Sequence, residues 1–408
     1  MTIVLQETKV SGPLKAYAGG FANHVALLGY SLCYRGKQRR FFGEFDQWLA
    51  SRRRTADELR QSDIEDFLND RVAAGQTDFV SMRAMKPVLD YFSKIGIVVQ
   101  QPEGPAPGAL TKLIGRYRRY LVGERGILET TATRYIAELA PLLEARACGS
   151  ECTLQNLKNL TESEIIAFAV SICPTLNRSG AAMFVTALRA FLTFLQLEGI
   201  IDRSMTASVP TVPGRRLTGL PKGIETDVLE RLLDSCDRDT KLGSRRYAIL
   251  LMLSRLGLRA GEVASLSLDD INWRSGEIVI VRGKSKRIET LPLPEDVGKA
   301  LADYISRWRP TTAVDRTVFV RNQAPHGAMT SAAVTQLVAH AAKRCGFERI
   351  SAHRLRHTAA TQMLRNGASL QEIGQILRHK QMITTTIYAK VDRERLRTIA
   401  RVWPGEVA

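Results

Sequence analysis

The stretch that decides the fold is Ser351-Ala-His-Arg-Leu-Arg-His-Thr-Ala-Ala-Thr361. Within it, His353 and Arg356 stand three residues apart, which places both side chains on one face of a helix. An arginine fork fits the non-bridging oxygens of a phosphate, and a histidine can move protons near neutral pH. A His-x-x-Arg pair taken alone is more often structural, so its meaning depends on what else the chain supplies.

Further reactive groups lie on both sides of this stretch. His379 follows Arg356 by 23 residues, and Tyr388 follows His379 by nine. Upstream, Arg259 lies in the segment LGLRAGEV, and Lys284 lies in a basic turn between two strand-like runs. These residue types suit phosphoryl transfer, because arginines stabilise the charge of a pentacoordinate transition state and a tyrosine hydroxyl can be a nucleophile. The sequence has no P-loop, no His-Glu-x-x-His motif and no acidic cluster, so we expect no metal and no cofactor.

Together these segments resemble the tyrosine recombinase (phage integrase) family, and especially the bacterial Xer-type enzymes. The family's GLRxxE motif is matched by Gly257 to Glu262, and its HxLRHTxAT box by His353 to Thr361. Its hairpin lysine, in a GKGxKxR-like turn, is matched by Gly283 to Arg287. Its LGHxxxxTTxxYxxV box is matched by Leu377 to Val391. The order and spacing of the motifs agree over the C-terminal part of the chain.

The resemblance implies a role for each reactive group. Tyr388 would attack the scissile phosphate and form a 3′-phosphotyrosyl link, Arg259 and Arg356 would clamp the phosphate, and Lys284 would protonate the leaving oxygen. His353 would act as acid or base or position the phosphate, and His379 would donate a hydrogen bond to it. Glu262 is expected to support Arg259, and His357 to pack in the core.

Two positions depart from the family pattern. Ser285 replaces the glycine after the lysine, which we expect to alter the flexibility of the turn. Arg378 replaces the glycine before the second histidine, and we expect its side chain either to touch phosphate or to lie in solvent.

Two proline- and glycine-rich stretches, near residues 101–108 and 209–221, divide the chain into three predicted domains. These are an extra N-terminal helical module at 1–100, a helical core-binding domain at 108–208 and a catalytic domain at 218–408. The first two share helical patterns at similar offsets, which favours a duplicated module, although any two amphipathic helical domains look alike. In the third, strand-like runs at 277–281 and 287–293 predict a hairpin. The expected fold is therefore mainly helical, with helical DNA-binding modules and a small antiparallel sheet in an α+β catalytic domain.

The charge of the chain indicates a polyanionic partner. The net charge is +17, and residues 343–408 alone carry thirteen Lys and Arg against five Asp and Glu. Such an excess neutralises phosphates and releases counterions, so we expect the partner to be double-stranded DNA. Arginine clusters at 52–54 and at 116–119 are candidates for backbone contacts, or are solvated helix faces. Without a signal peptide or an apolar run of about 20 residues, we expect a cytoplasmic bacterial protein, associated with the nucleoid when bound to DNA and not with a membrane.

The chain end after Tyr388 predicts a subunit contact. Leu396, Ile399, Ala400 and Trp403 form one apolar helical stripe before Pro404. The stripe either packs on its own domain or, as the resemblance implies, docks on a neighbour in a ring of four subunits, with or without other recombinases. Cys148 and Cys152 have no histidine nearby, so reduced thiols are expected rather than a metal site.

The expected activity is site-specific recombination or integration for a mobile element, or resolution of chromosomes or plasmids. Two alternatives stay open from the sequence. One is a relaxing enzyme like a type IB topoisomerase, and the other is an integrase-like protein that binds DNA without cleaving it.

Overall fold

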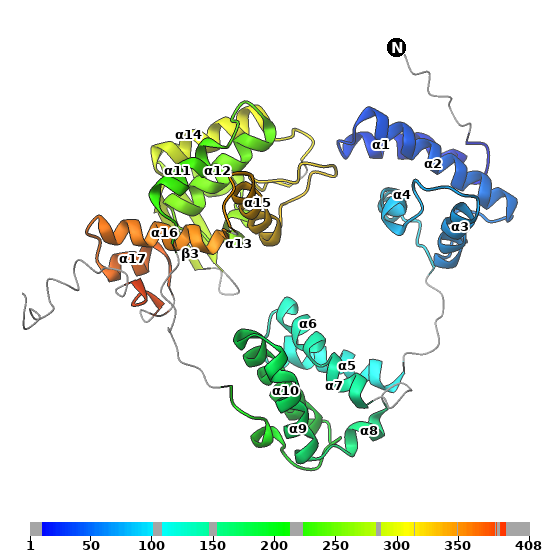
Figure 1. Cartoon of the computed structure of the whole chain (residues 1–408). Helices are drawn as coiled ribbons and strands as arrows, with labels where there is room; N and C mark the ends of the chain where they lie inside the picture. Colours follow the sequence, from blue (N-terminus) through cyan, green and yellow to red (C-terminus); the bar gives the residue numbers. More distant parts are fainter. Residues whose placement is uncertain are drawn as a thin grey trace, which may run out of the picture. The chain divides into compact units, whose positions relative to one another are not determined.

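The computed structural model describes residues 10–100, 108–146, 153–212, 223–282, 287–313, 315–348, 350–379, 381 and 384–388. One compact unit is formed by residues 101–216 and the other by residues 1–100 and 217–408 (Figure 1). The described residues are mostly helical, with one three-stranded antiparallel sheet. The predicted mixed and mainly helical fold is therefore confirmed.

The first 100 residues contribute four helices with a core of their own. These are α1 (Ala18–Leu27), α2 (Leu32–Ser51), α3 (Gln61–Ala73) and α4 (Met82–Lys94), after the 3-10 turn η1 (Lys15–Tyr17). Phe41, Phe45 and Leu49 repeat at helical spacing on α2 and are buried in that core. The buried carboxylate of Asp46 accepts hydrogen bonds from backbone N–H groups between residues 11 and 14, at 2.7–3.0 Å. These hydrogen bonds hold the segment that precedes α1 against helix α2.

Residues 101–216 form a second helical body. Its helices are α5 (Ala109–Arg119), α6 (Glu129–Glu138), α7 (Ala140–Arg146), α8 (Leu154–Lys158), α9 (Glu162–Ile172) and α10 (Arg178–Leu197), with single turns η2 (Tyr120–Glu124), η3 (Cys173–Thr175) and η4 (Thr206–Ser208). Thr161 and Glu164 cap α9 reciprocally, as their spacing predicts. Among the described helices, α10 is long and apolar enough by composition to cross a membrane. More than half of that apolar window is buried, however, because α10 is the central helix of this core.

The two helical bodies share local features at the offsets expected for a repeat. The helix α3 begins at Gln61 and α9 begins at Glu162, and each is followed by a long apolar helix. Both of those helices end two residues before a glycine with positive φ, Gly96 after α4 and Gly199 after α10. A left-handed glycine at this place is a common way to end a helix. The duplication remains a prediction, now with matching helix ends.

The C-terminal part of the chain is built around helix α12 (Lys241–Arg255). Helices α11 (Thr226–Asp234), α14 (Glu295–Asp303), α15 (Ser331–Arg344) and α16 (Ala352–Arg365) pack against it, and residues 248–253 of α12 are completely or almost completely buried. The short helices α13 (Ala260–Ser265) and α17 (Leu370–Ile376) and the turns η5 (Leu268–Asp270) and η6 (Tyr304–Trp308) complete this part. The buried α12 is the fixed element from which the site residues are positioned.

The predicted hairpin is confirmed. Strand β2 (Glu277–Arg282) pairs antiparallel with β3 (Arg287–Pro292), with Ile278 opposite Leu291. A short strand β1 (Ile271–Asn272), which the sequence did not predict, adds to the other edge of β2. Ile278, Ile280 and Leu291 face the core, whereas Val281 and Ile288 are exposed near the end of the hairpin.

Candidate functional site

Arg356 is held by the backbone of two other segments. It lies on α16 with only 3% of its surface exposed, and its guanidinium donates hydrogen bonds to the carbonyl oxygens of Gly257 and Leu377. Gly257 has a φ of +59°, and a Cβ there would lie 2.5 Å from a methyl carbon of Leu377. Only glycine allows this approach. Gly257 of the GLRxxE motif therefore provides a carbonyl oxygen that holds Arg356 of the HxLRHTxAT box in place.

Glu262 on α13 organises the first arginine. Its carboxylate accepts hydrogen bonds from the backbone N–H of Arg259 at 2.8 Å and from the guanidinium of Arg259 at 2.7 Å. Arg259 stands just before α13, and its guanidinium also donates a hydrogen bond to the carbonyl oxygen of Arg378 at 3.4 Å. Its side chain is 38% exposed, so a ligand in the cavity can reach it. The predicted support of Arg259 by Glu262 is therefore present in the structure.

Arg378 neither touches solvent nor stands ready for a phosphate, so both expectations for it are wrong. Its side chain is completely buried and forms an ion pair with Glu262 at 2.7 Å. A second, longer ion pair joins it to Glu289 of β3 at 4.0 Å. Its backbone has a φ of +56°, the left-handed conformation in which the family pattern has glycine. The ion pair explains why a long side chain stands at this position: Arg378 connects the segment after α17 to α13.

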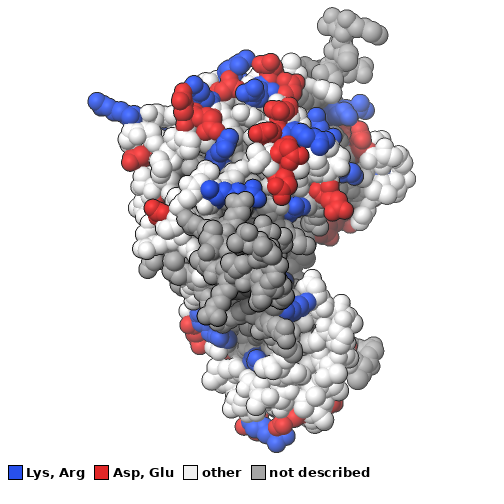
Figure 2. Space-filling view, turned by 60° about the vertical axis from the view of Figure 1, so that its left-hand side comes forward, with Lys and Arg blue, Asp and Glu red and all other residues white. Residues whose placement is uncertain are grey.

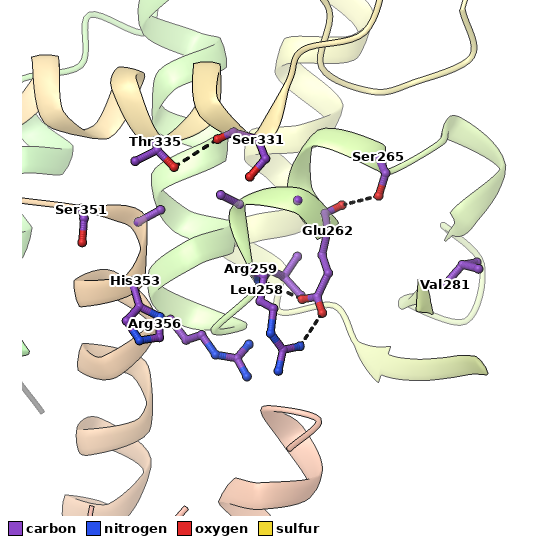
Figure 3. Close-up of a pocket in the computed structure, with 13 residues that line it drawn as sticks. Leu258, Arg259, Glu262, Ser265, Val281, Ser331, Thr335, Ser351, His353 and Arg356 are labelled. Carbon is purple, nitrogen blue, oxygen red and sulfur yellow. Dashed lines mark hydrogen bonds and ion pairs between the residues drawn. The ribbon is translucent and has the colours of Figure 1, made fainter. Parts of the chain in front are cut away.

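Four of the motif residues line one open cavity of about 680 Å³. Arg259, Glu262, His353 and Arg356 contribute to its wall. Figure 3 shows the side chain of Arg356, from α16, and that of Arg259, from the residue before α13, extending into the same region. Hydroxyl groups that sequence reasoning missed also line it, from Ser265, Ser331, Thr335 and Ser351. Ser331 and Thr335 are on α15, and the other two lie at the end of α13 and just before α16. They belong to none of the four motifs, so no sequence signal identifies them. The cavity thus offers cationic and hydrogen-bonding groups beside apolar ones such as Leu258, Ala260 and Val281.

Tyr388 lies behind these residues, with 1% of its surface exposed. Its hydroxyl is hydrogen bonded to Nδ1 of His357 at 2.8 Å. The expectation that His357 simply packs in the core is therefore wrong: the ring is half-buried and contacts the Tyr388 hydroxyl. His379 stacks parallel to Tyr388 with the ring centroids 6.4 Å apart, and its Nδ1 lies 2.7 Å from the hydroxyl of Thr385.

The site is positively charged and short of negative partners. Burial, with the charges of Arg259 and Arg378, lowers the pKa of Arg356 to about 9. Burial would raise the pKa of Glu262, but the charge of Arg378 and hydrogen bonds from Arg259 outweigh burial and lower it. Burial also lowers the pKa of His353, as do Arg356 and Arg259. An anion placed among these groups would relieve their mutual repulsion.

Burial acts in opposite directions on the two groups behind the cavity. It raises the pKa of Tyr388 to about 12, against the charges of Arg356 and Arg259. Burial, His353 and Arg356 lower the pKa of His357 to about 4. At neutral pH the pair therefore consists of a neutral phenol and a neutral imidazole.

Basic side chains outside the site are partly paired. Figure 2 shows Lys and Arg mixed with Asp and Glu over much of the visible described surface. Ion pairs join Arg52 to Asp70, Arg54 to Asp63, Arg116 to Glu198 and Arg118 to Glu129. Except for the pair with the buried Asp63, these pairs are at least partly exposed, so they contribute little stability, are screened by salt and leave their arginines available to a phosphate. Their contact with DNA stays a prediction.

Several predicted positions lie outside the described residues: Lys284, Ser285, Cys148, Cys152 and the C-terminal stripe from Leu396. Within the described ranges, no group of three or more His, Cys, Asp or Glu side chains is placed to hold a metal ion.

Comparison with known sequences agrees with the motifs. A profile for the "Phage integrase family" matches residues 222–395. The chain is 37% identical to "Putative integrase/recombinase y4rA" of Sinorhizobium fredii (strain NBRC 101917 / NGR234), over 97% of this chain and 96% of that protein. It is 30% identical to "Tyrosine recombinase XerD" of Listeria monocytogenes serovar 1/2a, over 71% of this chain and 97% of that protein.

Comparison with solved structures agrees with the fold. A XerH site-specific recombinase bound to palindromic difH substrate matches with a TM-score of 0.53 and 20% identity, over 71% of this chain and 95% of that one. A lambda integrase dimer bound to a COC′ core site matches with a TM-score of 0.52 and 19% identity, over 72% of this chain and 98% of that one.

Proposed function

Because the chain belongs to the phage integrase family of tyrosine recombinases, we propose that it cleaves and rejoins DNA strands through a 3′-phosphotyrosyl intermediate on Tyr388. The chain is a tyrosine-type site-specific recombinase.

The observation that carries the proposal is that two arginines and a histidine line one cavity, while the residue after Arg356, His357, is hydrogen bonded to the Tyr388 hydroxyl. Arg259 and His353 line the same cavity as the buried Arg356, and the charges of both arginines reach Tyr388. Preorganised donors of this kind stabilise the charge that develops on a phosphate during attack, without having to reorganise during the reaction.

In the proposed reaction, Arg259 and Arg356 hold the non-bridging oxygens of the scissile phosphate while the Tyr388 oxygen attacks phosphorus. The bond to the 5′ oxygen breaks, and Lys284 protonates that oxygen. His353, on the cavity wall, acts as acid or base or orients the phosphate, and His379 donates a hydrogen bond to it. Attack by the 5′ hydroxyl of a second strand then reverses the steps. Each phosphodiester bond broken is replaced by another, so no nucleotide cofactor is consumed.

The proposed ligand is double-stranded DNA, held by the predicted domains at 1–100, 108–208 and 218–408. The excess of Lys and Arg over the last 66 residues supports a phosphate partner. We further propose a ring of four subunits linked by the C-terminal stripe, alone or with other recombinases. The setting is the bacterial cytoplasm, with the nucleoid as the place of action, and the DNA sites are those of a mobile element or of a replicon that needs resolution.

Covalent trapping tests the proposal. DNA fragments that stay attached to the protein after denaturation are recovered and sequenced, and the recovered site is rebuilt as a nicked substrate whose cleavage cannot reverse. The wild-type chain should give a protein–DNA adduct on a denaturing gel. Tyr388→Phe should bind the same DNA and give no adduct. An undiminished adduct from that variant would exclude Tyr388 as the nucleophile, and binding without any wild-type adduct would favour a protein that only binds DNA.

A further inference from the structure

The hydrogen bond between Tyr388 and His357 lies outside the roles assigned above. His357 is on α16, one residue after Arg356, and its Nδ1 lies 2.8 Å from the Tyr388 hydroxyl oxygen. The rings of Tyr388 and His357 meet edge to face with centroids 5.5 Å apart. On its other side, the ring of His357 contacts that of His353 at 4.2 Å. The attacking oxygen is therefore presented to a second histidine, not to the one that lines the cavity.

The proposed reaction needs a place for the proton of Tyr388. With a phenol pKa of about 12, only about one hydroxyl in 10⁵ is ionised at pH 7. An oxygen that attacks phosphorus while still protonated would acquire a positive charge, so the proton has to leave as the bond forms. An imidazole with a pKa of about 4 is neutral at pH 7, and one ring nitrogen then carries a free lone pair.

We propose that His357 accepts the phenolic proton of Tyr388 during strand cleavage and returns it during rejoining. This inference rests on the proposed function. In cleavage the bond from Oη to hydrogen breaks and a bond from Nδ1 to hydrogen forms, while the bond from Oη to phosphorus forms and the bond from phosphorus to the 5′ oxygen breaks. The 5′ oxygen takes its proton from the separate acid, Lys284. One proton is thus taken up and one delivered in each strand cleavage.

The surroundings of His357 couple this transfer to the bound phosphate. The positive groups near the pair are Arg356 on the same helix and Arg259 before α13, with His353 and His379 as neighbouring titratable rings. In the absence of DNA their charges disfavour a second positive charge on His357. A phosphate bound between the arginines offsets those charges and makes His357 a stronger base. Deprotonation of Tyr388 is therefore expected when the substrate is in place.

Two substitutions separate proton transfer from simple positioning. His357→Asn places an amide oxygen close to the position of Nδ1, so it can accept the hydrogen bond but takes up no proton. His357→Phe fills the volume and offers no acceptor. The matched control is His340→Asn on α15, because His340 is exposed and on another helix. DNA binding measured alongside should be unchanged in all three variants.

The test is the single-turnover rate of adduct formation on the nicked, trapped site between about pH 5.5 and 9. The wild-type rate should be nearly independent of pH above about pH 6. His357→Asn should be slower by about 10² to 10⁴ at pH 7, and its rate should rise about tenfold per pH unit because hydroxide must then remove the proton. A wild-type rate and flat profile in His357→Asn would reduce His357 to a positioning role and overturn the inference. Faster cleavage in both variants would show that His357 restrains Tyr388, and would overturn it too.

A second substrate distinguishes the base from the acid. A sulfur in place of the bridging 5′ oxygen leaves without needing a proton. This substrate should restore cleavage to Lys284→Ala but not to His357→Asn. Restoration of His357→Asn would assign His357 to the leaving group and contradict the proposal. Absence of any adduct from the wild-type chain would overturn the proposed function, and this inference with it.

Discussion

Replacing Glu262 by glutamine should destabilise the C-terminal part of the chain far more than replacing its buried partner Arg378. The Glu262 side chain is 9% exposed and pairs with the completely buried Arg378 at 2.7 Å and with Arg259 at 2.7 Å. Glu262→Gln keeps the shape and one acceptor but leaves the Arg378 charge buried without its carboxylate. Arg378→Gly removes the buried charge itself, and Glu262 keeps Arg259.

The expected magnitudes follow from this asymmetry. At 2.7 Å and an effective dielectric constant of about 20, the attraction between Arg378 and Glu262 is about 6 kcal/mol before desolvation is subtracted. Removing one partner of a buried pair typically costs about 3–5 kcal/mol. Arg378→Gly relieves a left-handed backbone worth about 1–2 kcal/mol, and Glu262 keeps Arg259 as its partner, so the net loss should be smaller than for Glu262→Gln. The double variant should therefore recover most of the stability that Glu262→Gln loses.

Differential scanning calorimetry of the full chain measures these differences. For a unit of this size, about 3–5 kcal/mol corresponds to a fall in Tm of roughly 6–20 °C. The matched control is Glu295→Gln, which breaks an exposed pair with Lys299 and should not shift Tm measurably. Equal losses in Glu262→Gln and Arg378→Gly, or a double variant no more stable than Glu262→Gln, would refute the view that Arg378 is a buried charge dependent on Glu262.

Four further outcomes are expected. Arg356→Ala should slow cleavage by about a hundredfold, equivalent to about 3 kcal/mol of transition-state stabilisation, with a smaller effect on DNA binding; equal losses would indicate a binding role only. DNA cleavage, measured as adduct on a denaturing gel, should persist in excess chelator; if the chelator abolished the adduct, the reaction would depend on a metal. Deleting residues 394–408 should spare binding to one site but abolish four-subunit complexes in native gels, and persistent tetramers would favour a tail packed on its own domain. The pKa of Glu262 in the folded chain is lowered from 4.5, so its contribution to stability is present above about pH 4.5 and is lost as pH falls toward the folded pKa. In calorimetry, the Tm of Glu262→Gln should therefore fall less between pH 4.5 and lower pH than the Tm of the wild-type chain.

Much of the fold follows from local sequence patterns. The run of β-branched residues from Ile278 to Val281 predicts a strand, and the repeat of Phe41, Phe45 and Leu49 predicts a helix with one buried face. These rules work because the geometry of a strand or a helix sets which residues share a face. The two-residue strand β1 escaped prediction because it is too short to show any alternation.

The sequence by itself determined the motifs, their order and the chemistry they suggest, since residue types and spacings are enough to recognise the family's reactive groups. Only the tertiary structure decided how those groups are paired. Arg378 and Glu262 are 116 residues apart, and His357 and Tyr388 are 31 apart, so no local rule connects them. Whether a charged side chain meets water, phosphate or a buried carboxylate depends on how distant segments pack and on the cost of leaving a charge without a partner. Because a buried charge needs a partner, Arg378 forms an ion pair with Glu262. The segment of Tyr388 packs against α16, which brings its hydroxyl into hydrogen-bond distance of His357.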